Sequence, residues 1–176
     1  RVFRVKGYNV PEFSRTSKGL PVINLISIDK NEKVKAMVHY SADDTDPSKY
    51  MFFVTKNGLI KRTSLEEFEN INRNGKIAIK LNEGDELAFA KGTTGEDEII
   101  IAGSNGKAVR FLENTVRPLG RTARGVNGFI VDGGTVTGMA TNKVGKYILT
   151  VTENGYGKKS SLDDYRITNR GGKGVK

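Results

Sequence analysis

Arginine, lysine and glycine recur in this sequence in one short pattern whose chemistry suits phosphate. The pattern is an Arg, two mostly small residues, a Lys or Arg, usually a Gly, and then an apolar residue. Glycine lets the backbone approach a ligand with its N–H groups pointing outward, and the basic side chains supply charge. Arginine can also grip a phosphate with two parallel hydrogen bonds. The pattern occurs as copy 1 at residues 15–20, copy 2 at 73–78, copy 3 at 121–126 and copy 4 at 170–175.

Each copy contains two basic residues, and a further basic residue stands eleven positions before the first Arg of each copy. The basic residues within the copies are Arg15 and Lys18, Arg73 and Lys76, Arg121 and Arg124, and Arg170 and Lys173. The upstream residues are Arg4, Arg62, Arg110 and Lys159. Copy 2 departs from the pattern because Ile77 occupies the Gly position. We expect all of these basic residues to bind phosphate, although the stems of the upstream four could instead cover apolar surface.

The regular recurrence of the copies favours a long polyanion over a small ligand. One basic, Gly-rich loop fits a nucleotide, whereas equivalent loops on successive repeats form a track of positive sites, which suits a duplex backbone. No aromatic residue lies within the copies to stack on single-stranded bases, and no recognition helix is evident. The expected contacts are to phosphate, weakly dependent on sequence and strongly dependent on salt. If the pattern were only a turn between strand pairs, that role would explain its Gly but not its paired basic residues.

Composition supports a polyanion partner and excludes several kinds of site. The 176 residues include 29 Lys and Arg against 20 Asp and Glu, a net charge of +9, and such a balance is typical of nucleic-acid-binding domains. The chain has no Cys and one His, which excludes a disulfide framework, a Cys-built zinc site and a His-rich metal site. No apolar run approaches the length of a membrane span, so we expect a cytosolic protein.

No grouping of residues indicates catalysis or a metal. Asp43, Asp44 and Asp46 lie in an acidic loop that lacks the following Gly and Glu of an EF-hand. The lysine at 173 is not part of a Walker loop, because no Ser or Thr follows it. We therefore expect no catalytic residue, no metal ligand and no cofactor in this chain.

The hydrophobic pattern predicts repeated β-hairpins. Asn-Gly pairs end at Gly58, Gly106 and Gly155, 48 and 49 positions apart, and Asn-Gly between apolar runs is a strong hairpin signal. The expected hairpin strands are residues 50–55 with 59–63, 99–102 with 108–112, and 147–151 with 156–160. Further strand pairs are expected at 22–28 with 34–40, 77–81 with 86–90, and 128–131 with 135–139. This predicts an all-β array of four-stranded repeats with approximate units 1–49, 50–97, 98–145 and 146–176, the first and last incomplete.

The segment Arg170-Gly171-Gly172-Lys173-Gly174 resembles the signature box of the C-terminal domain of the bacterial DNA gyrase A subunit. That box reads Gln-Arg-Arg-Gly-Gly-Lys-Gly; here Thr168 and Asn169 stand in the places of its Gln and first Arg. Residues 6–8 with 11–13, 120–123 and 153–159 are similar to the same family. No complete box is present, and in this family the complete box normally lies in the first blade. We expect this chain to begin after that blade.

The resemblance implies a β-pinwheel, a propeller-like disc of usually six blades that exchange a strand, with duplex DNA wrapped around its basic rim. It implies a bacterial, cytoplasmic and nucleoid-associated protein, itself non-catalytic. The parent would be an ATP- and Mg²⁺-dependent type IIA topoisomerase (an isomerase) that introduces negative supercoils as an A2B2 complex with the B subunit. The nearest alternative is the similar domain of topoisomerase IV, which recognises substrate topology. A protein-binding propeller and a small enzyme on a β scaffold remain as alternatives of other classes.

Overall fold

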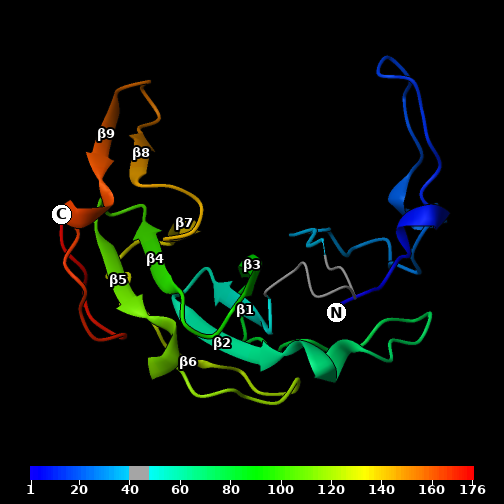
Figure 1. Ribbon diagram of the computed structural model, residues 1–176, viewed down its shortest axis with the longest axis horizontal. Helices are drawn as coiled ribbons and strands as arrows, with labels where there is room; N and C mark the ends of the chain where they lie inside the picture. The colour runs from blue at the N-terminus through cyan, green and yellow to red at the C-terminus, as the bar shows by residue number, and fades with distance from the viewer. Residues whose placement is uncertain (40–47) are drawn as a thin grey trace.

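The protein, seen here in a computed structural model that describes residues 1–39 and 48–176, is built from β-hairpin units that follow one another around an open arc (Figure 1). The described residues contain nine β-strands and five short 3₁₀ helices, and no α-helix. No helix among them is long and apolar enough to cross a membrane. The N-terminal segment lies at one end of the arc and the C-terminus near the other.

The best-formed sheet has the strand order β3-β1-β2-β6. Strands β1 (Tyr50–Thr55) and β2 (Leu59–Ser64) form the first expected hairpin. Strand β3 (Leu87–Thr93) pairs with the other edge of β1, and β6 (Val126–Asn127) pairs with β2. The turn glycine Gly58 has a φ of +84°, as a tight hairpin turn requires.

The next two units repeat this hairpin. Strands β4 (Glu98–Gly103) and β5 (Ala108–Leu112) pair antiparallel, and β7 (Val136–Thr141) adds to β4 to give the order β5-β4-β7. Strands β8 (Tyr147–Val151) and β9 (Gly157–Ser161) form a two-stranded sheet. All three hairpins expected from the Asn-Gly pairs are present, and the all-β propeller-like fold is confirmed.

Strand β6 comes from the segment that follows copy 3, yet it completes the sheet of the preceding unit. The same arrangement recurs in the units before and after this one, where isolated antiparallel bridges join Val2 to Lys76 and Ala108 to Val175. Successive units therefore exchange a short strand, as the family resemblance implies.

Three expected strand pairs are wrong. Residues 77–81 form no strand, and β3 pairs with β1 instead; likewise β7 pairs with β4 and not with residues 128–131. The central strands β1 and β4 are buried on both faces and take a partner on each edge. Strands β3 and β7 therefore pair with these central strands and not with the apolar runs that precede them in the sequence. Residues 22–28 contain only the 3₁₀ helix η2 (Val22–Asn24), and 34–39 contain no strand; Tyr40 and the acidic residues Asp43, Asp44 and Asp46 lie outside the described residues.

The main core joins the units to one another. It contains Phe52 from β1 and Phe111 from β5, whose ring centroids are 6.5 Å apart and which are both fully buried. Because these side chains come from different sheets, their packing fixes how neighbouring units sit. A second cluster around Phe53 and Phe68 lies beside the N-terminal segment.

We predict that Phe52→Ala lowers the free energy of unfolding by about 3–5 kcal/mol, the usual cost of emptying a buried aromatic site. Phe13→Ala is the matched control, since Phe13 is 48% exposed and should change stability little. Chemical denaturation of both variants tests this; equal effects would contradict the assignment of the core.

Candidate nucleic-acid interface

Copies 2, 3 and 4 pack against their neighbours in one common way. Each lies along the second hairpin strand, or its equivalent, of the preceding unit. In copy 2, Lys76 exchanges two backbone hydrogen bonds with Val2, at 2.8 and 2.9 Å. In copy 4, Val175 does the same with Ala108, also at 2.8 and 2.9 Å, and in copy 3, Val126 pairs with Ile60. The three loops therefore occupy equivalent places on successive units.

A glycine makes each of these close approaches possible. Gly125 has a φ of +105°, and a Cβ there would lie 2.6 Å from the carbonyl oxygen of Ile60. Gly174 has a φ of +74°, and a Cβ there would lie 2.8 Å from the carbonyl oxygen of Ala108. Any side chain would clash with backbone, so the Gly of the pattern serves the fold.

Copy 2 keeps this glycine at a different position. Ile77 stands in the Gly position of the pattern, and another glycine makes the close approach. Gly75 takes the role, with a φ of +72° and a Cβ position 2.9 Å from the carbonyl oxygen of Val2. Its glycine thus comes two residues earlier than in copies 3 and 4, so Lys76 follows the glycine instead of preceding it.

Copy 1 differs from the others in its surroundings. It lies at the end of a long loop between η1 (Gly7–Asn9) and η2, which extends away from the sheets (Figure 1). Arg15 and Lys18 are exposed, and a Cβ on Gly19 would meet nothing within 4 Å. Among the described residues, copy 1 packs on no strand.

The basic side chains of copies 2 to 4 remain accessible to different degrees. Arg73 and Arg124 are exposed and Lys76 is half-buried. The guanidinium of Arg121 lies 3.3 Å from the Glu67 carboxylate, and the ammonium of Lys173 lies 3.8 Å from the carboxylate of Asp132.

Arg170 of copy 4 is exposed but tethered. It donates hydrogen bonds to the carbonyls of Thr115 and Asn127, at 3.3 and 3.1 Å. Arg121 in copy 3 and Arg170 in copy 4 are thus held in place by partners within the protein, whereas Arg124 and Lys173 are less constrained.

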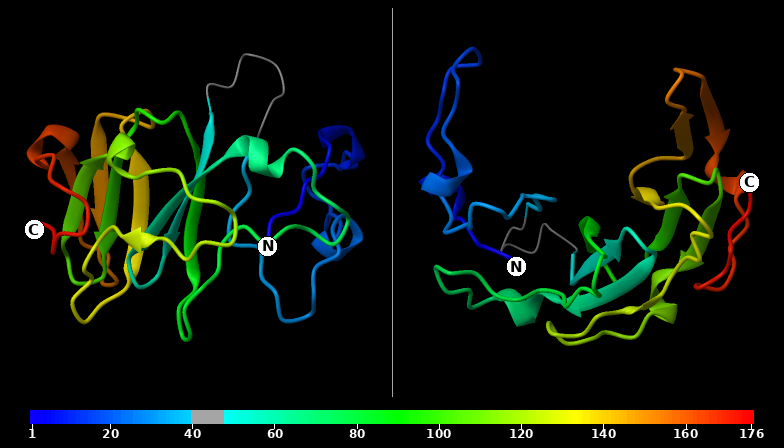
Figure 2. Two further views of the ribbon diagram at one scale, coloured as in Figure 1. Left: turned by 90° about the horizontal axis from the view of Figure 1, so that it is seen from below. Right: turned by 180° about the vertical axis from the view of Figure 1, so that it is seen from behind.

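The segments that carry copies 2, 3 and 4 follow one another along the convex side of the arc (Figure 2). Strands β3 and β7 lie toward the concave side, while β2 and β5 lie toward the convex side, beside the copies (Figure 1). The strand exchange therefore places three basic loops in succession along one outer edge.

The upstream residues Arg62 and Arg110 have partners inside the protein. Arg110 is 9% exposed; its guanidinium donates to Glu98 and, through Nη1, to the carbonyls of Leu162 and Tyr165, at 2.8 and 2.9 Å. Those carbonyls belong to the 3₁₀ turn η5 (Leu162–Asp164) and its end, in the next unit.

Arg62, 7% exposed, donates to the carbonyl of Gly95 at 3.3 Å within its own unit and reaches the following unit through an ion pair. It lies 4.6 Å from the Tyr50 ring centroid and 3.8 Å from the carboxylate of Glu113, the first residue of η4 (Glu113–Thr115). Arg4 is exposed but donates to the carbonyl of Glu69 at 2.8 Å, directly after η3 (Leu65–Phe68). Three of the four upstream residues thus hold the 3₁₀ turn of the next unit. Lys159 is exposed, with its ammonium 4.1 Å from the Tyr147 ring centroid.

Sequence reasoning missed Lys61, the residue that lies against copy 3 from inside. Its side chain is fully buried, and its ammonium donates to the carbonyls of Ala78, Arg121 and Ala123, at 2.6, 2.7 and 3.3 Å. Burial, and then the Arg121 charge, lowers its pKa from 10.5 to about 8, while the Glu67 carboxylate opposes the shift. One sequence signal was available: the positions one repeat away, Phe3 and Val109, are apolar.

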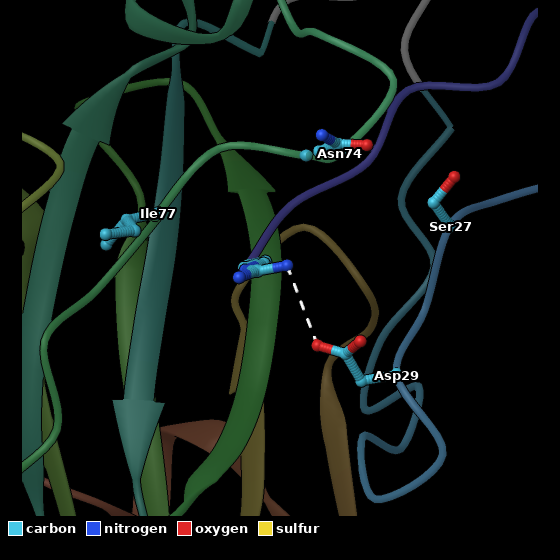
Figure 3. A pocket seen from close by; sticks show the side chains of 6 residues that line it. Ser27, Asp29, Asn74 and Ile77 are labelled. Atoms are coloured by element: carbon cyan, nitrogen blue, oxygen red, sulfur yellow. Dashed lines mark ion pairs between the residues drawn. The ribbon is translucent and has the colours of Figure 1, made fainter.

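A polar hollow of about 480 Å³ lies beside copy 2 (Figure 3). Its lining includes Ser27, Asn74, Gly75 and an ion pair at 3.8 Å between Arg1 and Asp29. These groups do not form a catalytic arrangement. In residues 1–39 and 48–176, no group of three or more His, Cys, Asp or Glu residues is placed to hold a metal ion.

The model of the DNA gyrase C-terminal domain family, a β-propeller, matches residues 1–39, 49–93, 97–143 and 146–176. The chain belongs to this family.

Relatives of this gyrase-domain chain agree with that membership. The DNA gyrase A subunit of Staphylococcus epidermidis (strain ATCC 12228 / FDA PCI 1200) is 47% identical over 179 residues, which cover 100% of this chain and 20% of that protein. The chain thus spans one fifth of the length of such a relative.

Solved structures show the same fold. The C-terminal domain of DNA topoisomerase IV matches with a TM-score of 0.79 and 27% identity, over 89% of this chain and 49% of that one. A DNA gyrase A C-terminal domain matches with a TM-score of 0.75 and 27% identity, over 90% of this chain and 53% of that one.

We predict that Lys61 makes the stability of this gyrase-type domain rise with pH above about 8. Between pH 8 and 10.5 the unfolded chain keeps the lysine proton that the folded chain has lost, so unfolding takes up protons and its free energy rises with pH. Between pH 8 and 10.5, the free energy of unfolding of the unaltered chain should rise by about 3 kcal/mol more than that of Lys61→Met. Denaturant titrations of both proteins from about pH 7 to 10.5 test this; parallel curves would contradict it.

Proposed function

We propose that this chain binds duplex DNA through its phosphates, without sequence specificity, and bends or wraps it along the convex side of the arc. The observation that carries the proposal is the equivalent placement of copies 2, 3 and 4 on successive units. Membership of the gyrase C-terminal domain family and the net charge of +9 support it.

The chemistry of one loop explains why phosphate is the proposed ligand. In copy 3, exposed Arg124 stands beside Gly125, which brings the loop against β2. Arg121 adds a second guanidinium within the same loop. A phosphate oxygen could accept from either group, and each neutralised phosphate would release counterions and strengthen binding at low salt.

Acidic neighbours would modulate this binding. Glu67 and Asp132 pair with Arg121 and Lys173 near the surface, where such ion pairs are individually weak. A phosphate could displace either carboxylate at small cost. Arg62 and Arg110 are left out of the proposed contact surface, because both side chains are buried and already form ion pairs within the protein. Arg4 would act mainly between units.

Several phosphate sites along a curved edge would favour a bent duplex. Bending a site of 20–30 base pairs by 40–90° costs about 1–6 kcal/mol, which contacts from successive loops would offset. Arg15 and Lys18 of copy 1, on their extended loop, could add to the same duplex, as could Arg170 and Lys159.

The parent protein would be the A subunit of a bacterial DNA gyrase, acting in the cytoplasm on nucleoid DNA and introducing negative supercoils. It would form an A2B2 complex with the B subunit, with ATP and Mg²⁺ bound outside this chain. The 47% identity to gyrase A favours gyrase, and the structural match to the topoisomerase IV domain supports that enzyme as the second candidate.

The first test removes one exposed basic side chain from each packed copy, in the variant Arg73→Ala/Arg124→Ala/Lys173→Ala. If each side chain neutralises one phosphate, the slope of log K against log salt should become shallower by about 3, because each contact contributes about 0.9. Duplex affinity would be measured by fluorescence anisotropy between about 50 and 200 mM salt.

The control variant Lys30→Ala/Lys33→Ala/Lys146→Ala removes the same charge from exposed lysines outside the copies. We expect it to keep most of the slope. Equal losses in the two variants would show that bulk charge, and not the track of loops, binds DNA.

A further inference from the structure

Lys61 lies where three segments of the proposed interface meet. It stands on β2, Ala78 ends copy 2, and Arg121 and Ala123 belong to copy 3. All three donors of its ammonium point at backbone carbonyls of these segments, at 2.6, 2.7 and 3.3 Å. The N–H of Lys80 also donates to the Ala123 carbonyl, at 3.2 Å, which ties copy 3 to the segment that follows copy 2.

The inward carbonyls determine where the N–H groups of copy 3 point. In a trans peptide, the N–H of a residue points opposite to the carbonyl of the residue before it. Because the carbonyls of Arg121 and Ala123 face Lys61, the N–H groups of Thr122 and Arg124 face away from it. Among the described residues, neither N–H has a hydrogen-bond partner, and both residues are exposed.

We propose that Lys61 is a positioning residue for phosphate binding by copy 3: its ammonium holds the loop carbonyls inward and so presents two free N–H groups beside Arg121 and Arg124. Outward N–H groups beside positive side chains make an anion-binding concavity. This inference rests on the proposed function, since it explains how one loop of the track is prepared for its ligand.

Among copies 2, 3 and 4, this device is particular to copy 3. At the positions one repeat before and after Lys61 stand Phe3 and Val109, which have no donor for a loop carbonyl. Copy 4 is held in another way: the N–H of Gly171 donates to the carbonyl of Gly128, and Ile130 donates to that of Gly172. Copy 4 therefore serves as an internal control for copy 3.

Burying an ammonium is costly unless its hydrogen bonds are satisfied, and here all three donors are used. Methionine at this position would fill a similar volume but donate nothing. The carbonyl of Arg121 would then lose its donor and turn toward water, and the N–H of Thr122 would turn inward with it. The carbonyl of Ala123 would keep only the N–H of Lys80, so the N–H of Arg124 would be held outward less firmly. Glutamine would keep two donors without the charge.

The test combines Lys61 variants with the substitution of one basic residue in copy 3 or copy 4. Lys61→Met should weaken duplex binding about tenfold at about 0.1 M salt, the effect of about one lost phosphate contact, and Lys61→Gln should recover most of that loss. Added to Arg124→Ala, Lys61→Met should have little further effect, because the loop is already impaired. Added to Lys173→Ala, it should have its full effect, since copy 4 is independent.

The outcomes separate the two proposals. If Arg124→Ala and Lys173→Ala bind like the unaltered chain, the proposed function fails at these copies. If both weaken binding while Lys61→Met does not, or if Lys61→Met weakens it equally in both backgrounds, the positioning role is wrong. Circular dichroism and thermal unfolding would establish that each variant is folded.

A measurement on the unaltered chain covers the case in which the Lys61 variants do not fold. Duplex DNA should slow amide hydrogen exchange at Thr122 and Arg124 at low salt. If copy 3 binds DNA but these two amides exchange at unchanged rates, the outward N–H groups are not phosphate ligands, and the inference is overturned.

Discussion

The constraint on which this structure depends is the close approach of each unit's loop to the preceding unit's hairpin. Val126 pairs with Ile60 and Val175 with Ala108, and in each case a left-handed glycine lets the backbones meet. The outer edges at Val2, β2 and Ala108 are each supplied by the following unit. Arg62 and Arg110 reinforce the same junctions by reaching the following 3₁₀ turns. The buried rings of Phe52 and Phe111 pack against each other between two of these units.

This constraint connects the fold to the proposed function. The segment that completes a neighbour's edge is also the segment that carries the basic residues. The geometry that holds two units together therefore determines the spacing of the positive loops along the convex side. A duplex that follows this edge would meet one loop per unit, without any groove or pocket being needed. Changes that loosen a junction, such as a side chain at Gly125, should disturb both stability and the track.

The sequence predicts the local features of this structure well and the long-range ones poorly. Asn-Gly pairs predict all three hairpins because the turn requires positive φ at specific positions. The hairpin partner β2 of β1 is predicted, but its second partner β3 is not, since that pairing depends on burial of both faces of β1. The roles of Arg62 and Arg110 were left open for a similar reason: only the neighbouring unit supplies Glu113 and the carbonyls of η5. Lys61 looked like one more basic surface residue, although its counterparts Phe3 and Val109 are apolar.

The most direct test of the central claim is ligation of nicked circular duplex DNA in the presence of the chain, with topoisomers resolved at low and physiological salt. If DNA wraps along the track of loops, the linking number should shift with protein concentration, and the shift should shrink as salt rises. The variant lacking Arg73, Arg124 and Lys173 should give a much smaller shift. An unchanged linking number at a salt concentration where the duplex is fully bound would contradict wrapping, and failure to bind duplex at low salt would contradict the account as a whole.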